Sequence, residues 1–415
     1  MQRKIALKSD FICTSRKKSV SLQPKVICAE KLLNQIIIMN NLTIHSMPNL
    51  EEYIRQGEPL QRERGQIWQT AIGLQQVDGL NTSAYLLQTA KQHIEGDITL
   101  QKAKELIDSY YQSQQVRQNS ESEATEEADK VSARIAELLS EKTFAFNPSQ
   151  LIAIHRHLFT GIYKFAGKIR DYNITKREWV LRGDTVYYAG ADMISETLKY
   201  DFDQEKSFNY SSVSVDEAIA HLATFCSNIW QIHPFGEGNT RTTAVFMIKY
   251  LTTLGFKVNN EIFANNSWYF RNALVRANYT NVLQGVSYNP SFLERFFRNM
   301  LLNENHPLQN RELHLDWQVT NDHEQVQSAN QSAKEDEVVL SKCKNCTLEE
   351  LAVLRILQQT PSATQKQIAA AIGKSERTVK TLTVNLTNKG IISRRNGKRN
   401  GYWEINGQIL KQTIQ

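Results

Sequence analysis

The nine residues HPFGEGNTR, from His233 to Arg241, constrain the fold of this chain more than any other stretch. An apolar pattern with helical spacing runs from Val215 to Ile232 and stops before Pro234, because proline lacks a backbone donor and breaks a helix. A second helical pattern runs from Thr240 to Leu254. We therefore expect a loop, named here the 233–241 loop, between one helix end and the next helix start.

The 233–241 loop combines residue types that bind a polyphosphate and move a proton. A helix N-terminus offers free backbone N–H groups to an anion, and Gly236 and Gly238 let that backbone approach closely. Arg241 can reach a phosphate oxygen with its planar fork, and Glu237 can coordinate Mg²⁺. His233 has an ordinary pKa suited to a general base. These features predict a site that holds phosphates and a metal while a histidine removes a proton.

Composition shifts divide the chain into six parts. Residues 1–38 are basic and without clear period, and Met39 is an alternative start. Two polar stretches without helical period are typical of linkers. The expected parts are a basic extension (1–38), a helical segment (39–111), a linker (112–128), a mainly helical domain (129–305), a second linker (306–346) and a C-terminal domain (347–415).

The central domain contains one stretch that does not have helical character. Val180-Leu181 and Thr185–Tyr188 flank the turn residues Arg182-Gly183-Asp184. Short apolar or β-branched runs around such a turn are typical of two paired strands. We therefore expect a mainly α domain that carries a single β-hairpin.

Charge is distributed unevenly along the chain. Residues 39–346 are acidic overall, whereas residues 347–405 hold ten Lys or Arg against four Asp or Glu. This difference indicates that any nucleic-acid contact lies at the C-terminal end. No stretch is apolar over the length that spans a bilayer, and the few, unevenly spaced cysteines suit a reducing compartment. A cytoplasmic protein without membrane contact is expected.

The 233–241 loop resembles the signature of the Fic (filamentation induced by cAMP) family, HPFx(D/E)GN(G/K)R. Ile154–Phe159 and Phe165–Arg170 resemble the region that leads into the Fic flap hairpin, and Lys176–Tyr188 resembles the flap itself. The resemblance covers about residues 130–300. It implies the Fic helical fold with a β-hairpin flap, and nucleotidyl transfer, most often of AMP.

The resemblance implies a role for each residue of the loop. A Ser, Thr or Tyr hydroxyl of a target protein, or of this chain itself, would attack the α-phosphate of ATP, and pyrophosphate would leave. His233 would be the general base and Glu237 would hold Mg²⁺. Asn239 would contact the α-phosphate and Arg241 the β-phosphate. Backbone N–H groups near Gly236–Gly238 would form an anion hole, with Thr240 beside them.

The flap and one following helix would complete the site. The flap would hold the target segment by adding it as a strand, through Lys176, Trp179 and Val180. Tyr269 and Asn265 are candidates for the nucleoside pocket, and a core or surface role is as well supported for both.

Two positions depart from the family pattern. Thr240 stands where Gly or Lys is usual, and Ala244 stands where many AMP-transferring members carry a second arginine for the γ-phosphate. Residues 61–111 resemble the antitoxin-type helical domain that accompanies Fic proteins, in which a helix points a glutamate at that second arginine. Asp78 is the best match to this glutamate. We expect that Asp78 finds no cationic partner and inhibits weakly, and a merely packed helical subdomain is the alternative.

The C-terminal domain resembles a winged helix-turn-helix. Arg377 and Lys380 lie in the expected recognition helix and would face a major groove. Four cations at the wing tip suit phosphate contact: Arg394, Arg395, Lys398 and Arg399. Double-stranded DNA is the expected partner, with protein contact or homodimerisation as the alternative.

Three functions are compatible with these patterns. A protein adenylyltransferase that uses ATP and Mg²⁺ is the leading one. The rival is a DNA-binding regulator whose Fic domain binds nucleotide with little transfer, which Thr240 and Ala244 favour. A phosphotransferase that uses the γ-phosphate fits the fold but not the loop, since Thr240 is not Lys.

Overall fold

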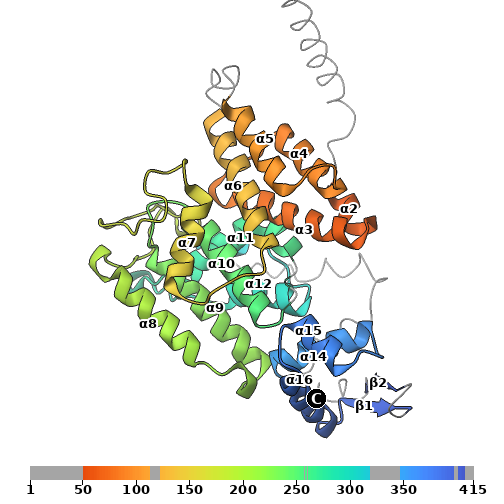
Figure 1. Ribbon diagram of the computed structural model, residues 1–415. Coiled ribbons are helices and arrows are strands. Elements are labelled where there is room, and N and C mark those ends of the chain that lie inside the picture. Colours follow the sequence, from red (N-terminus) through yellow and green to blue (C-terminus); the bar gives the residue numbers. More distant parts are fainter. Residues whose placement is uncertain are drawn as a thin grey trace, which may run out of the picture. The chain divides into compact units, whose positions relative to one another are not determined.

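A computed structural model describes residues 50–112, 122–256, 258, 260–317, 346–396 and 401–406 (Figure 1). The basic extension, the alternative start at Met39, and the wing cations Lys398 and Arg399 lie outside these residues. No helix in the described ranges is both long enough and apolar enough to cross a membrane.

The N-terminal part is helical, as expected. Pro59 opens the second helix at a position where proline is tolerated. Ser83 caps the fourth element, which ends at the left-handed Gly96. The last helix of this part begins at Ser122, inside the stretch expected to be a linker. The elements are α2 (Leu50–Gln56), α3 (Pro59–Gly73), η1 (Leu74–Asp78), α4 (Ala84–Glu95), α5 (Leu100–Gln112) and α6 (Ser122–Ser140).

The central part follows the expected helical pattern and adds one helix, α8, that the periodicity did not predict. Its helices are α7 (Pro148–Phe159), α8 (Ile194–Ser207), α9 (Val215–Ile232), α10 (Asn239–Thr253), α11 (Asn260–Asn278) and α12 (Ser291–Leu302). Short 3₁₀ turns connect them: η2 (Trp179–Leu181), η3 (Ala191–Met193), η4 (Tyr210–Ser212), η5 (Val282–Gln284) and η6 (Asn310–Leu313).

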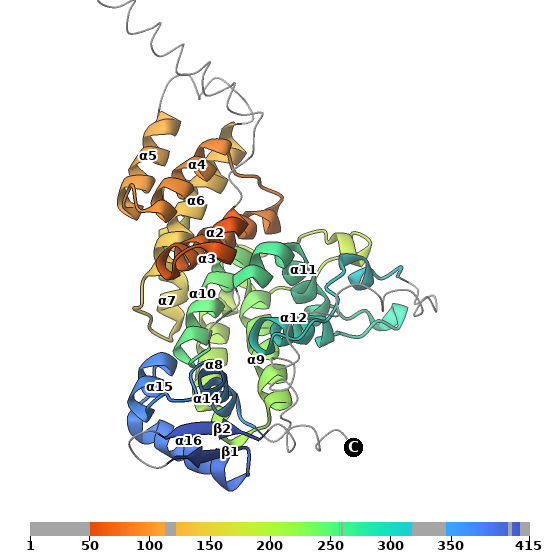
Figure 2. The ribbon, with the colours of Figure 1, turned by 90° about the vertical axis from the view of Figure 1, so that its right-hand side faces the viewer.

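Helix α10 is the central element, because every residue from Asn239 to Leu251 is buried. It contacts α6, α7, α9 and η1, so the end of the 233–241 loop is surrounded by helices (Figure 2). The N-terminal helices share this core through α3, which packs against α11. A Cβ atom on Gly73 would lie 2.4 Å from the backbone of Ala264, which explains the glycine at this crossing.

The expected flap folds back on itself but does not form two paired strands. The Glu178 N–H donates to the Asp184 carbonyl at 2.9 Å, and Arg182 turns the chain in the left-handed region. The Val180 carbonyl accepts instead from the N–H of Leu315 at 3.0 Å. Because this carbonyl bonds outside the hairpin, the arms form a reversed loop around η2 instead of a ladder.

The C-terminal part has the expected layout of three helices and a hairpin. Thr347 and Thr364 open the first two helices with capping boxes, and Ser375 caps the third. Arg394 lies opposite Trp403 in the antiparallel pair. The elements are α14 (Leu348–Gln359), α15 (Gln365–Ile372), α16 (Glu376–Asn388), β1 (Ile392–Arg395) and β2 (Tyr402–Ile405).

Candidate active site

His233 ends α9 in the left-handed conformation, with φ of 49°, and its side chain is buried. Its Nδ1 lies 3.2 Å from the Trp230 carbonyl, and the ring of Tyr188 packs on the imidazole with centroids 4.3 Å apart. A carbonyl accepts only, so Nδ1 carries the proton and Nε2 keeps its lone pair. Burial, and then the charge of Lys176, hold the pKa of His233 well below its usual value. The imidazole is therefore neutral at pH 7, as a base requires.

The glycines of the 233–241 loop allow a close approach that no other residue would. Gly238 has φ of 77°, and a Cβ there would lie 2.4 Å from the ring of Phe159. A Cβ on Gly236 would lie 2.8 Å from the Tyr172 hydroxyl. The backbone between these glycines runs directly into the first turn of α10, and the free N–H groups of a helix N-terminus can bind an anion.

Asn239 and Thr240 stabilise the loop from inside. The Asn239 amide accepts from the Phe235 N–H at 3.0 Å and donates to the Phe235 carbonyl at 2.8 Å. The Thr240 hydroxyl accepts from the Trp230 indole N–H at 3.0 Å. Both side chains are buried. These hydrogen bonds hold the loop in place and occupy both side chains, so we expect phosphates to bind to the loop backbone.

Arg241 is almost completely buried and is held by side chains from the N-terminal helices. It donates to Gln75 Oε1 at 3.0 Å and to Glu127 Oε1 at 2.6 Å. Its Nε lies 2.7 Å from Asp78 Oδ2, where the N–H is not aligned for a hydrogen bond, so this contact is an ion pair only. Burial alone would lower the pKa of Arg241, but Asp78, Tyr163 and Glu127 together raise it. These contacts with Gln75, Asp78 and Glu127 are named the Arg241 clamp.

The clamp overturns the expectation that Asp78 has no cationic partner. Asp78 pairs with Arg241, the first arginine of the loop, although Ala244 leaves the second position without a cation. The reason is position: Asp78 ends η1, which packs against α10 where Arg241 lies. Sequence reasoning also missed Glu127 and Gln75. Glu127 lay in a Glu-rich stretch interpreted as a linker, and no local signal distinguished Gln75 from its neighbours.

Glu237 is half-exposed, and its carboxylate pairs with the flap residue Lys176 at 2.8 Å. His155 donates from Nε2 to the Glu237 carbonyl at 3.0 Å and accepts from the Gly167 N–H at 2.8 Å. In the described ranges no three His, Cys, Asp or Glu side chains gather as a metal site. A single accessible carboxylate fits Mg²⁺, which is commonly held by one or two carboxylates plus substrate phosphates.

A cavity of about 420 Å³ lies beside the loop, and this volume suits a small-molecule ligand. Its lining is largely charged and includes the partly exposed indole of Trp268, with Arg271 over the ring, 5.3 Å from the centroid. Tyr269, the expected nucleoside residue, is fully buried and donates to the Phe292 carbonyl at 3.2 Å. Asn265 is exposed and does not line the cavity. The lining includes Asp78, Glu127, Lys176, Glu237, Arg241 and Trp268.

The three flap residues expected to bind a target differ in accessibility. The Trp179 side chain is 53% exposed, whereas Val180 is buried. Behind them, Glu178 forms a two-bond ion pair with Arg271, which also lines the cavity. The Tyr188 hydroxyl bonds to the same carboxylate at 3.3 Å. Of the three, Trp179 therefore presents the largest apolar surface to a partner.

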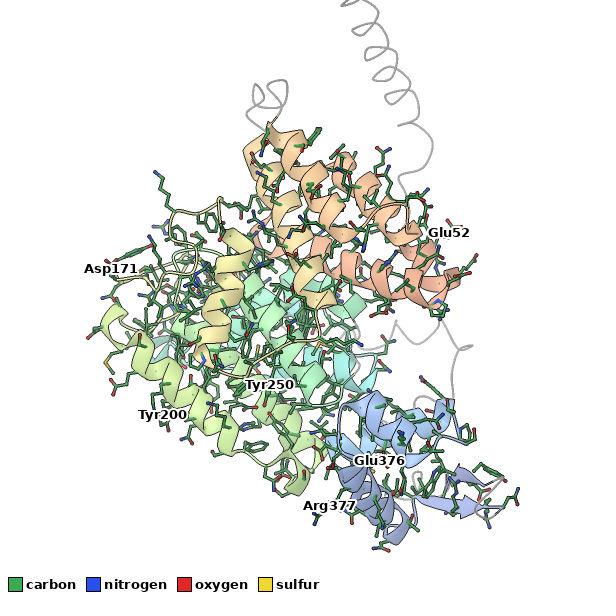
Figure 3. The ribbon with its side chains drawn as sticks, in the orientation of Figure 1. Glu52, Asp171, Tyr200, Tyr250, Glu376 and Arg377 are labelled. Carbon is green, nitrogen blue, oxygen red and sulfur yellow. The ribbon has the colours of Figure 1, made fainter. Side chains whose placement is uncertain are left out.

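The expected DNA-contacting cations that the structure describes are exposed: Arg377, Lys380, Arg394 and Arg395. Arg377 and Lys380 lie on the open face of α16, and Figure 3 shows Arg377 beside Glu376 in its first turn. In the hairpin, Arg394 lies over the Trp403 ring and Arg395 pairs with Glu404 at 2.7 Å. The two helix cations are therefore better placed for a phosphate or base than the two wing cations described.

Two family models match this chain. Residues 145–251 match the Fic/DOC family, and residues 350–393 match a winged helix-turn-helix DNA-binding family. Over 109 residues the chain is 29% identical to "Probable protein adenylyltransferase y4lH" of Sinorhizobium fredii (strain NBRC 101917 / NGR234). This alignment covers 26% of the chain and 53% of that relative, so the chain spans about half the length of the relative.

Two solved structures show weak overall similarity. The N-terminal Fic domain of a Bartonella effector protein from Bartonella sp. AR 15-3 is 21% identical, with TM-score 0.30, over 38% of this chain and 71% of that one. The N-terminal FIC domain of Bep8 from Bartonella sp. 1-1C is 20% identical, with TM-score 0.35, over 44% and 86%. The family matches and the helical architecture confirm the Fic domain and the winged helix expected from the sequence.

Proposed function

Residues 145–251 of this chain form a Fic/DOC domain, and on that premise we propose that it transfers AMP from ATP to a hydroxyl of a protein target. His233 Nε2 takes the proton of the hydroxyl, whose oxygen then attacks the α-phosphate while pyrophosphate leaves. The relative described as a probable protein adenylyltransferase supports this reaction class. The ATP and target partners, and a cytoplasmic location, belong to the same proposal.

The observation that carries the proposal is the state of His233. Its Nδ1–H is directed to a carbonyl, its pKa is depressed, and it ends the helix immediately before an anion-binding loop. A neutral imidazole with a fixed lone pair is the form that accepts a proton in general-base catalysis. An imidazole with only a packing role would not require a glycine-containing loop and a helix N-terminus beside it.

The loop backbone and Glu237 complete the chemistry. N–H groups near Gly236 and Gly238 face the charge that develops on the α-phosphate oxygens. Glu237 would hold Mg²⁺, which supplies charge neutralisation at the phosphates when it is bound. In place of a second arginine at position 244, Lys176 and Arg271 are the remaining cations that line the cavity. We therefore assign the outer phosphates to Lys176, which lies beside Glu237, because Arg271 lies over the Trp268 ring.

The base of the nucleotide lies against Trp268 in this proposal. The indole is partly exposed in the cavity wall, and a nucleobase can stack on the part of the ring that Arg271, 5.3 Å from its centroid, leaves open. Asp78, through the Arg241 clamp, restrains the β-phosphate site and has a regulatory role. The target segment approaches along the flap at Trp179 and Lys176.

The proposal is tested with ATP labelled at the α- or the γ-phosphate, using the full chain as its own acceptor and a cell extract as a source of others. The Asp78→Asn/Glu127→Gln background frees Arg241 and is expected to increase the signal. Label from the α-phosphate that disappears in His233→Ala, but not in the control His157→Ala, supports AMP transfer. Label from the γ-phosphate would replace this function with phosphorylation, and no label from either would contradict both.

A second candidate function is DNA binding through the C-terminal part. The winged helix-turn-helix match and the exposed Arg377 and Lys380 on α16 favour it. Duplex affinity should fall steeply with salt, and removing each phosphate-contacting cation should reduce the slope by about one. Arg377→Ala/Lys380→Ala is the test, and the control is Arg311→Ala, which lies in η6 outside the winged helix. An unchanged slope in the double variant would contradict DNA contact by α16.

A further inference from the structure

Arg170 is a buried cation that joins the catalytic histidine to the flap. It follows α7 and the turn at Gly167, and only 4% of its surface is exposed. Its Nε donates to the His233 carbonyl at 2.8 Å, and Nη2 lies 3.3 Å from the Ile232 carbonyl. The Arg170 backbone N–H donates to the Pro234 carbonyl at 2.9 Å. One residue thus bonds to three successive carbonyls at the turn that carries His233.

The same guanidinium holds both ends of the flap. Nη1 donates to the Tyr172 carbonyl, which precedes the flap, and Nη2 donates to the Ala189 carbonyl, which follows it, each at 2.6 Å. The described residues include no ion pair of Arg170, so its charge is met by carbonyl oxygens. A planar group with five donors can satisfy this many acceptors in fixed directions, whereas an ammonium group cannot reproduce that geometry.

The turn requires such a support. His233 adopts a left-handed conformation, which costs a residue with a Cβ about 1–2 kcal/mol. Strain of this kind persists only where the surroundings over-determine the conformation. His155 supports the other side of the loop, through Gly167 and Glu237, but does not contact the flap. Tyr188 packs on the imidazole itself, and Gln231 donates to the Tyr187 carbonyl at 3.0 Å, but Arg170 bonds to the carbonyls of the strained turn and to those at both ends of the flap.

We propose that Arg170 is a positioning residue that couples the flap to the orientation of His233. A target segment bound to the flap fixes the positions of Tyr172 and Ala189. Because Arg170 bonds to both of their carbonyls and to that of His233, it then fixes the orientation of the imidazole. The inference rests on the proposed transfer reaction for its catalytic consequence. Its structural part, the coupling of two backbone segments, stands on the contacts alone.

Two substitutions separate geometry from charge. Arg170→Lys keeps the charge and loses the fork, while Arg170→Gln loses both. The matched control is Arg276→Lys, because Arg276 on α11 also donates to a carbonyl, that of Leu313 at 2.7 Å, which belongs neither to the 233–241 loop nor to the flap. Transfer by the full chain should fall about 100-fold in both Arg170 variants, as expected for a misplaced catalytic group. Equilibrium binding of a non-hydrolysable ATP analogue should remain as in the wild type.

A pH profile distinguishes positioning from simple loss of structure. Lys176, Arg170 and Arg271 are the cations that face His233, and each disfavours its protonation. Arg170→Gln should therefore move the acid limb of the rate profile to higher pH, whereas Arg170→Lys should leave the limb in place and lower only the plateau. An unmoved acid limb in Arg170→Gln would contradict the effect of the Arg170 charge on His233, and a wild-type plateau in Arg170→Lys would overturn the positioning role.

Amide hydrogen exchange tests the coupling without any assay of transfer. In Arg170→Lys, exchange should accelerate together in residues 172–189 and 231–236, while Arg276→Lys leaves both segments as in the wild type. If only one of the two segments responds, the coupling is wrong even if His233 proves catalytic. If both respond but no α-phosphate label is ever transferred, the coupling stands and the transfer reaction is wrong.

Discussion

Arg170 and Arg241 are both buried arginines of the candidate site, yet they are satisfied in opposite ways. Arg170 bonds only to carbonyl oxygens of the site itself, at the turn and the flap. Arg241 is held mainly by the side chains of Gln75, Asp78 and Glu127, from helices that precede the Fic domain, with one longer bond of 3.4 Å to the Tyr163 hydroxyl inside it. The end of the site at His233, named the base end, is therefore held by backbone contacts that a ligand does not replace. The end at Arg241, named the phosphate end, is closed by side-chain contacts that a ligand can replace.

This difference indicates where regulation acts. A phosphate that reaches Arg241 must displace two carboxylates, both on elements that pack around α10. Among the described residues no carboxylate pairs with His233, but its side chain is buried and the ring of Tyr188 packs on the imidazole, so a target hydroxyl has to pass this ring. We infer that the chain is poised for proton transfer and restrained in nucleotide binding. The predictions below test the two ends in order of expected effect.

The largest effect should follow the removal of Arg241. Arg241→Ala leaves the partly buried carboxylates of Asp78 and Glu127 without their cation. We expect a loss of about 3 kcal/mol in the free energy of unfolding, the lower end of the range for a broken buried pair because both carboxylates keep some solvent contact. Chemical denaturation measures it. The triple variant Arg241→Met/Asp78→Asn/Glu127→Gln, which removes every charge, should recover most of the loss; no recovery would mean that packing, not charge, dominates.

Opening the clamp should strengthen nucleotide binding. In Asp78→Asn/Glu127→Gln, Arg241 keeps its hydrogen-bonding neighbours but loses both counter-charges, so the affinity for ATP should rise by 5- to 150-fold, the usual range of a coupling between two sites. Isothermal titration calorimetry measures it. Asp78→Asn alone should give the smaller part, because Asp78 lacks an aligned hydrogen bond to Arg241 and Glu127 has one. Equal ATP affinities in the wild type and the double variant would contradict the proposal that Asp78 and Glu127 restrain nucleotide binding.

Trp268 tests a part of the cavity that belongs to neither arginine. Trp268→Ala should weaken ATP binding by about 1 kcal/mol, the lower end for stacking of a base on an aromatic ring. The effect should be as large for adenosine as for ATP, since phosphates are not involved. Tyr269→Phe is the control, because Tyr269 is buried and only its bond to the Phe292 carbonyl is lost. A loss of affinity for ATP but not for adenosine would contradict the stacking.

The sequence predicted the local structure around His233 better than the contacts of Arg241, and the reason is physical. His233, the glycines and the helices around them are specified by local pattern, because Pro234 and the apolar periods fix where α9 and α10 meet. The Arg241 clamp depends on tertiary contacts between residues more than 100 positions apart, which no local spacing encodes. The flap was predicted as two strands for the same reason: the bond from Leu315 to Val180 is not visible in either segment alone.

The smallest effect expected is one of pH, and it tests whether the base end is truly preformed. A histidine with its ordinary pKa of about 6.5 would lose half of its basic form at that pH. Burial, and then Lys176, depress the pKa of His233, so the transfer rate should be as high at pH 6.5 as at pH 7.5 and fall only in more acid solution. The free energy of unfolding should also fall as the pH drops below 6.5. Because burial also lowers the pKa of His155 to about 4, the unfolded chain takes up protons below pH 6.5 that the native chain does not, and the unfolding midpoint should fall from pH 6.5 downward. The rate is measured across pH 5–8 with His93→Gln, remote from the cavity, as the control. A rate that halves near pH 6.5 would mean that the pKa of His233 is not depressed, which would contradict a base that is held neutral by the fold.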